Sequence, residues 1–252
     1  MTVAILILVG LGAGTLGSMI GVGGGIIMVP VLTLLGMPPA QTASTSLIAV
    51  TSTSISSTIE YSRQRRIDFK LGMMISAFAI PGAILGAVLS NYLSPESFKL
   101  YFGILLILAG TYVLYKNSIL KDNISKRRSS FLIAAVFAAA FGGGIISSLF
   151  GVGGGIIFVP LMLLVLGLNM QRAVPTSQLI LMMTSLAGIF AHGLLGHPDY
   201  LQAASLSAGA FAGAQMGARV SRTTKELLLQ RLLGLALISV AIEFVIDWFT
   251  SR

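Results

Sequence analysis

The sequence has no cysteine and few charged residues, and both shortages limit what the chain can be. Without cysteine there is neither a disulfide scaffold nor a thiolate metal site. Only 10% of the 252 residues are charged and 55% are hydrophobic, whereas soluble domains carry about 25% charged residues. A soluble fold of this composition would leave too much apolar surface in water. The composition therefore predicts an all-α polytopic membrane protein, with about eight transmembrane helices at roughly 20 residues per span.

Motifs for catalysis and metal binding are also missing. The chain has no HExxH, no GxSxG and no paired intramembrane carboxylates, so no enzyme activity is expected. The two histidines, His192 and His197, are too few for a transition-metal site, and no cofactor is predicted. The net charge of +8 comes from basic residues in a few loops. Membrane orientation explains this distribution better than a nucleic-acid partner does.

Ten apolar runs, each too long for a buried strand, predict helices. They cover residues 3–20, 25–36, 42–61, 70–91 and 97–115, and then 131–149, 154–168, 175–195, 201–220 and 229–249. The runs 25–36 and 154–168 are short for a full span, which predicts broken or re-entrant half-helices, or tilted segments. The polar, basic segment 116–130 predicts a cytoplasmic linker between two transmembrane repeats, 1–115 and 131–252.

An internal repeat runs through most of the chain. The segment GVGGGIIMVPVL at Gly21–Leu32 returns as GVGGGIIFVPLM at Gly151–Met162, with 9 of 12 positions identical and an offset of 130. Further on the offset becomes 131, and hydroxyl pairs, aspartates and glycines recur in register. The aligned residues are Thr45-Ser46 with Thr176-Ser177, Asp68 with Asp199, and Gly82 and Gly86 with Gly213 and Gly217.

Equivalent loops of the two halves carry opposite loads of Lys and Arg. The loop 63–70 is basic, whereas its counterpart 192–200 has no Lys or Arg. Conversely, the loop 91–99 has one Lys against one Glu, and its counterpart carries Arg219, Arg222, Lys225 and Arg231. Because short basic loops stay in the cytoplasm, the two halves are predicted to be inverted repeats, as in secondary transporters. Both termini then lie outside the plasma membrane of a prokaryotic cell.

Three consecutive glycines precede the second apolar run of each half. They are Gly23, Gly24 and Gly25, and Gly153, Gly154 and Gly155. Each glycine costs a helix ~1 kcal/mol and permits a positive φ. A helix that begins there at membrane depth would offer its first N–H groups to an anion. The glycines therefore predict a substrate site, and the alternative is close helix packing through small residues.

Hydroxyl side chains crowd the segment 42–58, where most are expected to bond between helices or back to their own backbone. The pairs that recur in both halves are predicted to line a substrate path, with one amide beside them: Thr45, Ser46, Thr176, Ser177 and Gln178. Arg172 is interpreted as a cytoplasmic positive charge. Glu243 has two interpretations, a proton relay or a contact with the interface or another copy. The predicted site is therefore neutral, without a direct arginine contact.

At these residues the chain resembles the sulfite exporter TauE/SafE family, also called the TSUP family of anion permeases. The resemblance rests on GxGGGxxxxP in each half, the Thr-Ser pair about 20 residues later, and a GAxxGA helix. It covers nearly the whole chain and implies a plasma-membrane secondary transporter for a small sulfur-containing anion, such as sulfite or a sulfonate. The lipid bilayer is then a second partner, and a homo-oligomer stays open.

Two other functions stay open beside this one. The first is a transporter of another small anion or of an organic acid. The second is a non-transporting membrane assembly or regulatory subunit. A polar central cavity at the two glycine turns would favour transport, and a dry, uniformly packed centre would favour the subunit.

Overall fold

The computed structural model describes residues 2–119 and 130–225, together with scattered residues between 227 and 242. Most of the predicted linker, most of the predicted helix 229–249 and Glu243 lie outside the described residues. Every regular element in the described part of the chain is a helix, so the predicted all-α class is confirmed.

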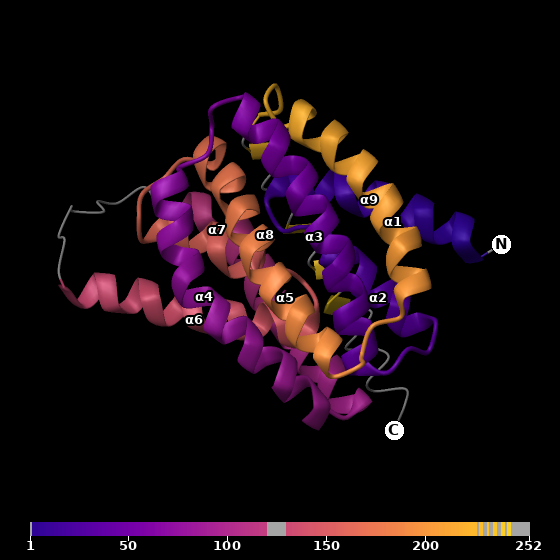
Figure 1. Ribbon diagram of the computed structural model, residues 1–252. Coiled ribbons are helices and arrows are strands. Elements are labelled where there is room, and N and C mark those ends of the chain that lie inside the picture. Colours follow the sequence, from indigo (N-terminus) through magenta and orange to yellow (C-terminus); the bar gives the residue numbers. More distant parts are fainter. Residues whose placement is uncertain are drawn as a thin grey trace.

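Nine α-helices and one short 3-10 helix follow one another within the described residues (Figure 1). They are α1 (Thr2–Ile20), α2 (Gly25–Leu34), α3 (Pro39–Arg63), α4 (Phe69–Leu89), η1 (Ser90–Tyr92), α5 (Pro95–Ile119), α6 (Ser130–Phe150), α7 (Gly155–Leu164), α8 (Met170–Leu194) and α9 (Tyr200–Val220). The lengths pair across the halves. Helices α2 and α7 have 10 residues each, α3 and α8 have 25, and α4 and α9 have 21.

The aligned aspartates begin equivalent helices. Asp68 accepts a hydrogen bond from Leu71 N at the start of α4, and Asp199 accepts one from Gln202 N at the start of α9, both at 3.0 Å. A side-chain oxygen at this position satisfies one of the N–H groups that a helix start leaves unpaired. The recurrence of Asp68 and Asp199 in the sequence is thus explained by helix capping.

Helix α8 begins earlier than predicted. The sequence places its start near Pro175, but the helix begins at Met170. Asn169 caps it, since Asn169 Oδ1 accepts a hydrogen bond from Arg172 N at 3.1 Å. The proline therefore lies inside the helix, near its start, instead of beginning it.

Three helices of the described part are long and apolar enough to cross a membrane, over Val3–Ile20, Phe69–Tyr92 and Met170–Leu194. Gly25–Leu34 and Ala135–Phe150 are shorter apolar helices. Helix α3 has the length of a span, but its many hydroxyls lower its mean hydropathy, and most of them are buried against protein. The number of about eight spans, at roughly 20 residues each, stays a prediction.

Helices of one half pack mainly on helices of the other half. Helix α1 lies beside α9 and α4 beside α6, while α3 and α8 pass between these pairs (Figure 1). Glycine allows the close approach. A β-carbon added to Gly82 would lie 2.1 Å from Phe141 O, and one added to Gly213 would lie 2.1 Å from Leu11 O. The GAxxGA segments therefore serve helix packing, as small residues do in membrane proteins.

Candidate functional site

The backbone leaves the helical conformation at two equivalent places. The first turn, Gly21–Gly24, joins α1 to α2, and the second turn, Gly151–Gly154, joins α6 to α7. The residues just before α2 and α7 have φ angles of 82° at Gly24 and 72° at Gly154. These angles lie in the left-handed region, where a β-carbon raises the energy. Glycine is therefore required at both positions.

The two turns pack directly against each other. A β-carbon added to Gly25 would lie 2.5 Å from Gly151 O, and one added to Gly155 would lie 2.2 Å from Gly21 O. Both separations are far below ordinary contact distances, so only glycine permits this approach. Two backbone segments 130 residues apart in sequence thus meet inside the protein.

A serine from each half binds the turn of the other half. Ser46 Oγ donates to Gly151 O at 2.7 Å, and Ser177 Oγ donates to Gly21 O at 2.6 Å. Both serines are fully buried. A buried carbonyl outside regular structure needs a donor, and these hydroxyls supply it. The contact between the turns is therefore reciprocal.

The threonines beside these serines act elsewhere. Thr176 Oγ1 accepts a hydrogen bond from Asp68 N at 3.0 Å, and Thr45 Oγ1 accepts one from Asp199 N at 3.1 Å. Each threonine thus fixes the start of a helix in the opposite half. The structure brings the predicted glycines and serines together and sets both threonines at the helix-capping aspartates.

Gln178 supports the first turn. Its Nε2 donates to Gly17 O at 3.0 Å, and its Oε1 accepts a hydrogen bond from Ser57 Oγ at 3.0 Å. Gly17 O also accepts hydrogen bonds from the N–H groups of three turn residues, Gly21, Val22 and Gly23. Both the nitrogen and the oxygen of the Gln178 amide therefore bond within the protein in this conformation.

Two aliphatic side chains pack against Gly23 of the first turn and Gly153 of the second, and sequence reasoning missed both. A β-carbon added to Gly153 would lie 2.6 Å from Val50 Cγ1 and 2.9 Å from Leu181 Cδ2. Val50 and Leu181 are fully buried and equivalent at the offset of 131. Each lies four residues after its serine, Ser46 or Ser177, one helical turn along the same helix. That shared register is the signal that could have found them.

The starts of α2 and α7 carry free hydrogen-bonding capacity. The first N–H groups bonded to their turns are Ile27, to Gly24 O at 3.1 Å, and Ile157, to Gly154 O at 2.9 Å. The N–H groups before these have no acceptor within their own helix. Together they give each helix start a partial positive charge of about +0.5. Such a start is suited to an anion.

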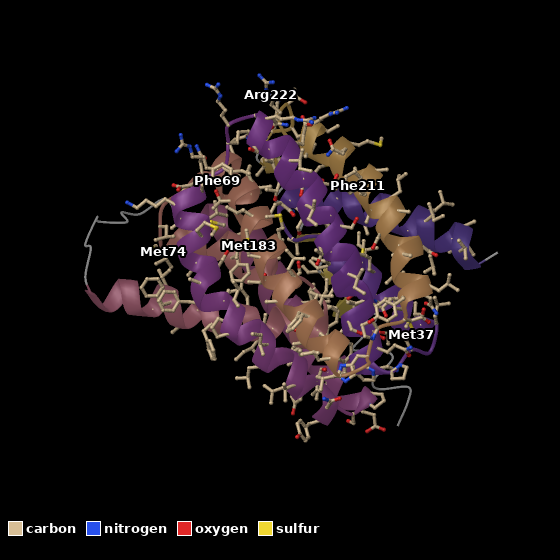
Figure 2. The ribbon with its side chains drawn as sticks, viewed as in Figure 1. Met37, Phe69, Met74, Met183, Phe211 and Arg222 are labelled. Carbon is tan, nitrogen blue, oxygen red and sulfur yellow. The ribbon has the colours of Figure 1, made fainter. Side chains whose placement is uncertain are left out.

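Fixed charges lie away from the turns. No Lys, Arg, Asp or Glu is fully buried within the described residues. Nitrogen-tipped side chains gather at one end of the molecule, around Arg222 (Figure 2). At that end Arg66 lies over the ring of Tyr61, with its guanidinium carbon 5.2 Å from the ring centroid, and burial lowers the pKa of Arg66. Arg172 is exposed, as expected for a charge at the surface.

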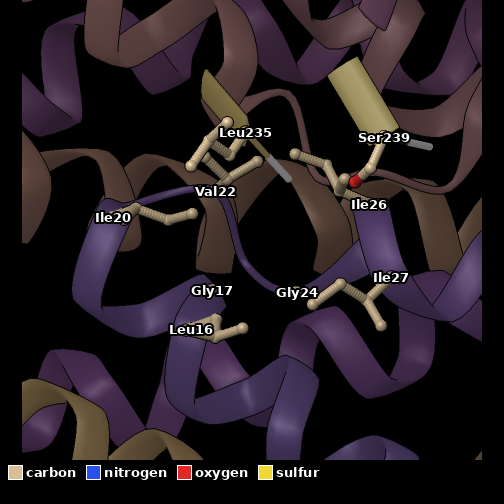
Figure 3. A pocket seen from close by; sticks show the side chains of 9 residues that line it. All are labelled: Leu16, Gly17, Ile20, Val22, Gly24, Ile26, Ile27, Leu235 and Ser239. Atoms are coloured by element: carbon tan, nitrogen blue, oxygen red, sulfur yellow. The ribbon is translucent and has the colours of Figure 1, made fainter. Parts of the chain in front are cut away.

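An apolar cavity of about 360 Å³ lies beside the first turn (Figure 3). Residues of α1 and α2, together with Leu235 and Ser239, form its wall, and Gly24 borders it. The cavity lies beside one turn, so it differs from the polar central cavity that would favour transport. The centre is closed in this conformation, because the turns contact each other and Val50 and Leu181 pack against both.

Comparison with known proteins identifies relatives along the whole chain. The family model "Sulfite exporter TauE/SafE" matches residues 6–244. The chain is 30% identical to the probable membrane transporter protein YunE of Bacillus subtilis, over all of both chains. It is 27% identical to a probable membrane transporter protein of Haemophilus influenzae, over 98% of this chain and 96% of that one. No solved structure matches. The chain therefore belongs to the sulfite exporter TauE/SafE family of membrane transporters.

Proposed function

We propose that the protein is a secondary transporter of a small anion, working by alternating access between two inverted halves. The reciprocal contact of the two turns carries this proposal, because each half supplies both a turn and the serine that binds the other turn. In transporters built from inverted repeats, the substrate site lies at the repeat interface near the bilayer midplane, at broken helices. The two glycine turns match this description, with transmembrane repeats over 1–115 and 131–252.

We propose that the anion binds between Gly23–Gly25 and Gly153–Gly155. Backbone N–H groups at the starts of α2 and α7 attract an anion without a buried cation, which would hold it too tightly for release. A sulfur oxyanion presents several oxygen acceptors to such donors. The description of the family as a sulfite exporter supports sulfite or an organosulfonate as the substrate.

Binding requires the turns to separate, because they contact each other directly and Val50 and Leu181 pack against both. Separation breaks the hydrogen bonds from Ser46 to Gly151 O and from Ser177 to Gly21 O. The freed hydroxyls are then available as neutral donors to the anion. The same two serines thus stabilise the closed centre and complete the open site, while Thr45, Thr176 and Gln178 hold the surrounding backbone.

One observation favours a second function. The centre is closed by aliphatic side chains, as expected for a non-transporting membrane subunit. Membership of a family of membrane transporters favours transport instead. If the protein is a transporter, the alternative substrate is another small anion or an organic acid.

Uptake by the purified protein in liposomes tests the proposal. The panel contains sulfite, methanesulfonate, sulfate, chloride and acetate, with protein-free liposomes as the control. We expect saturable uptake of sulfite or methanesulfonate. Uptake of acetate alone would support the organic-acid alternative, and uptake of none of the five would favour the non-transporting subunit.

A further inference from the structure

The repeat places equivalent polar side chains at the ends of α3 and α8. Tyr61 and His192 occupy the same position at the offset of 131. Tyr61 Oη donates to Ser18 O at 2.8 Å, and His192 Nε2 lies 3.0 Å from Ser148 O. Ser18 and Ser148 are themselves equivalent at the offset of 130. Each half therefore has one aromatic side chain bonded to a carbonyl of its own first long helix, α1 or α6.

The next residues along the chain differ in chemistry. Arg66 lies over Tyr61, and its equivalent His197 places Nδ1 2.8 Å from His192 Nδ1. An arginine stays protonated at every physiological pH, whereas an imidazole gains or loses a proton near neutrality. The repeat thus has a permanent cation at one end and a titratable group at the other.

Hydrogen-bond geometry limits how many protons the histidine pair, His192 and His197, can hold. Ser148 O only accepts, so His192 Nε2 must carry a hydrogen. The two Nδ1 atoms, 2.8 Å apart, need one hydrogen between them, since two would clash and none would oppose two lone pairs. His197 Nε2 lies 2.7 Å from Asn91 Oδ1 of the other half.

Two proton counts satisfy this geometry, and at the higher count the proton is assigned to His197 because His192 is fully buried, where a charged imidazole is disfavoured. In the first, His192 is neutral, with its hydrogen on Nε2, and His197 carries hydrogens on both nitrogens. His197 then donates to His192 Nδ1 and to Asn91 Oδ1. In the second, His197 is also neutral, its hydrogen stays on Nδ1, and the Asn91 amide turns to donate to Nε2. We propose that the histidine pair is a binding site for a single proton. His197 takes up this proton, and the orientation of the Asn91 amide changes with the protonation of His197.

The hydrogen-bond partners of the pair in α6 and η1 are neutral groups. Around the pair, α6 contributes the Ser148 carbonyl and η1 contributes the Asn91 amide, neither of which ionises. At the start of α9 the Asp199 carboxylate accepts from Gln202 N, and Tyr200 follows it. The start of α5 carries Glu96 and Lys99. Burial lowers the pKa of His197, so the pair takes up its proton below the ordinary range of imidazole.

The proton strengthens a contact between the halves. His197 lies between α8 and α9, whereas Asn91 lies in η1 of the first half. A protonated imidazole forms a stronger hydrogen bond than a neutral one. The inverted arrangement, which belongs to the proposed function, puts this pair on the outer side of the membrane. A proton from outside would then stabilise the contact between the halves at that end only.

Nitrogen-15 NMR of histidine-labelled protein in detergent tests the site without measuring transport. The chain has only two histidines, so with a histidine-free tag two imidazoles are observed. From about pH 8 down to about pH 4, so that the titration extends below the ordinary range of imidazole, we expect the uptake of one proton. His197 should gain it, while His192 keeps its hydrogen on Nε2 throughout.

Two variants sharpen the assignment. His197→Gln should abolish the uptake, and Arg66→Gln, at the equivalent place of the other end, should leave both imidazole spectra unchanged. Two independent titrations, no uptake in this range, or a hydrogen on Nδ1 of His192 would each overturn the proposal. Because these readouts do not depend on substrate, failure of the liposome uptake leaves them intact.

Discussion

Ser177 Oγ donates to Gly21 O at 2.6 Å, although 156 residues separate the two in sequence. Ser46 makes the equivalent bond to Gly151 O. Neither carbonyl belongs to a helical hydrogen-bond ladder, since both glycines lie in the turns. The two serines therefore hold the centre of the protein together, and removing either hydroxyl should have a measurable cost.

Ser177→Ala should lower the free energy of unfolding by ~1–3 kcal/mol, because it leaves Gly21 O buried without its serine donor. Thermal unfolding in detergent measures this loss. Ser44→Ala is the matched control, since Ser44 is equally buried but donates only to Gln41 O within its own helix region. Equal stability of the two variants would contradict the role given to Ser177.

Gly153→Ala should destabilise the protein because its β-carbon would lie 2.6 Å from Val50 Cγ1, at a φ of 86°. The left-handed backbone alone costs roughly 1–2 kcal/mol. Adding Val50→Ala should recover the part of the loss that comes from the clash. Gly12→Ala is the control, because nothing lies within 4 Å of a β-carbon there. If the losses of stability in the two single variants simply added in the double variant, as they do for distant residues, direct contact between Gly153 and Val50 would be contradicted.

Thr176→Val should weaken the start of α4, because the N–H of Asp68 loses its hydroxyl acceptor. We expect a loss of ~1–3 kcal/mol in the free energy of unfolding. Thr176→Ser keeps the oxygen and should retain most of the stability. If Thr176→Val and Thr176→Ser had the same free energy of unfolding, the hydrogen bond to Asp68 would not contribute to stability. A role of Thr176 in substrate binding would then gain support.

Membrane orientation can be tested with single cysteines, since the chain has none of its own. Tyr92 and Arg222 are both exposed, and they are close to the equivalent ends of the two halves. Tyr92→Cys should react with an impermeant thiol reagent in intact cells, and Arg222→Cys only after permeabilisation. Reaction of Arg222→Cys from outside would contradict the inverted arrangement.

Much of the helix order follows from sequence alone, because the internal repeat fixes it. The glycines before α2 and α7 and the recurring Asp68 and Asp199 mark helix starts through backbone and capping chemistry. The early start of α8 was missed because Pro175 resembles a first-turn proline, whereas Asn169 supplies the actual cap.

Contacts between the halves could not be predicted in the same way. Alignment shows that Ser46 and Ser177 are equivalent, but equivalence does not reveal that each binds the other half. Val50 and Leu181 could not be singled out because a buried aliphatic residue on a helix is the commonest feature of any core. The histidine pair could not be predicted from the repeat, because the equivalent positions in the first half hold different residue types, Tyr61 and Arg66.

Cross-linking across the turns tests the central claim most directly. Val50 and Leu181 reach the same point, since a β-carbon at Gly23 would lie 2.9 Å from one and 3.3 Å from the other. Sulfite uptake is measured in liposomes holding Val50→Cys with Leu181→Cys, joined by a short reducible thiol cross-linker, with both single variants as controls. Our account predicts that cross-linking stops uptake and that reduction restores it. Uptake at the same rate before and after reduction would contradict a substrate path between the turns.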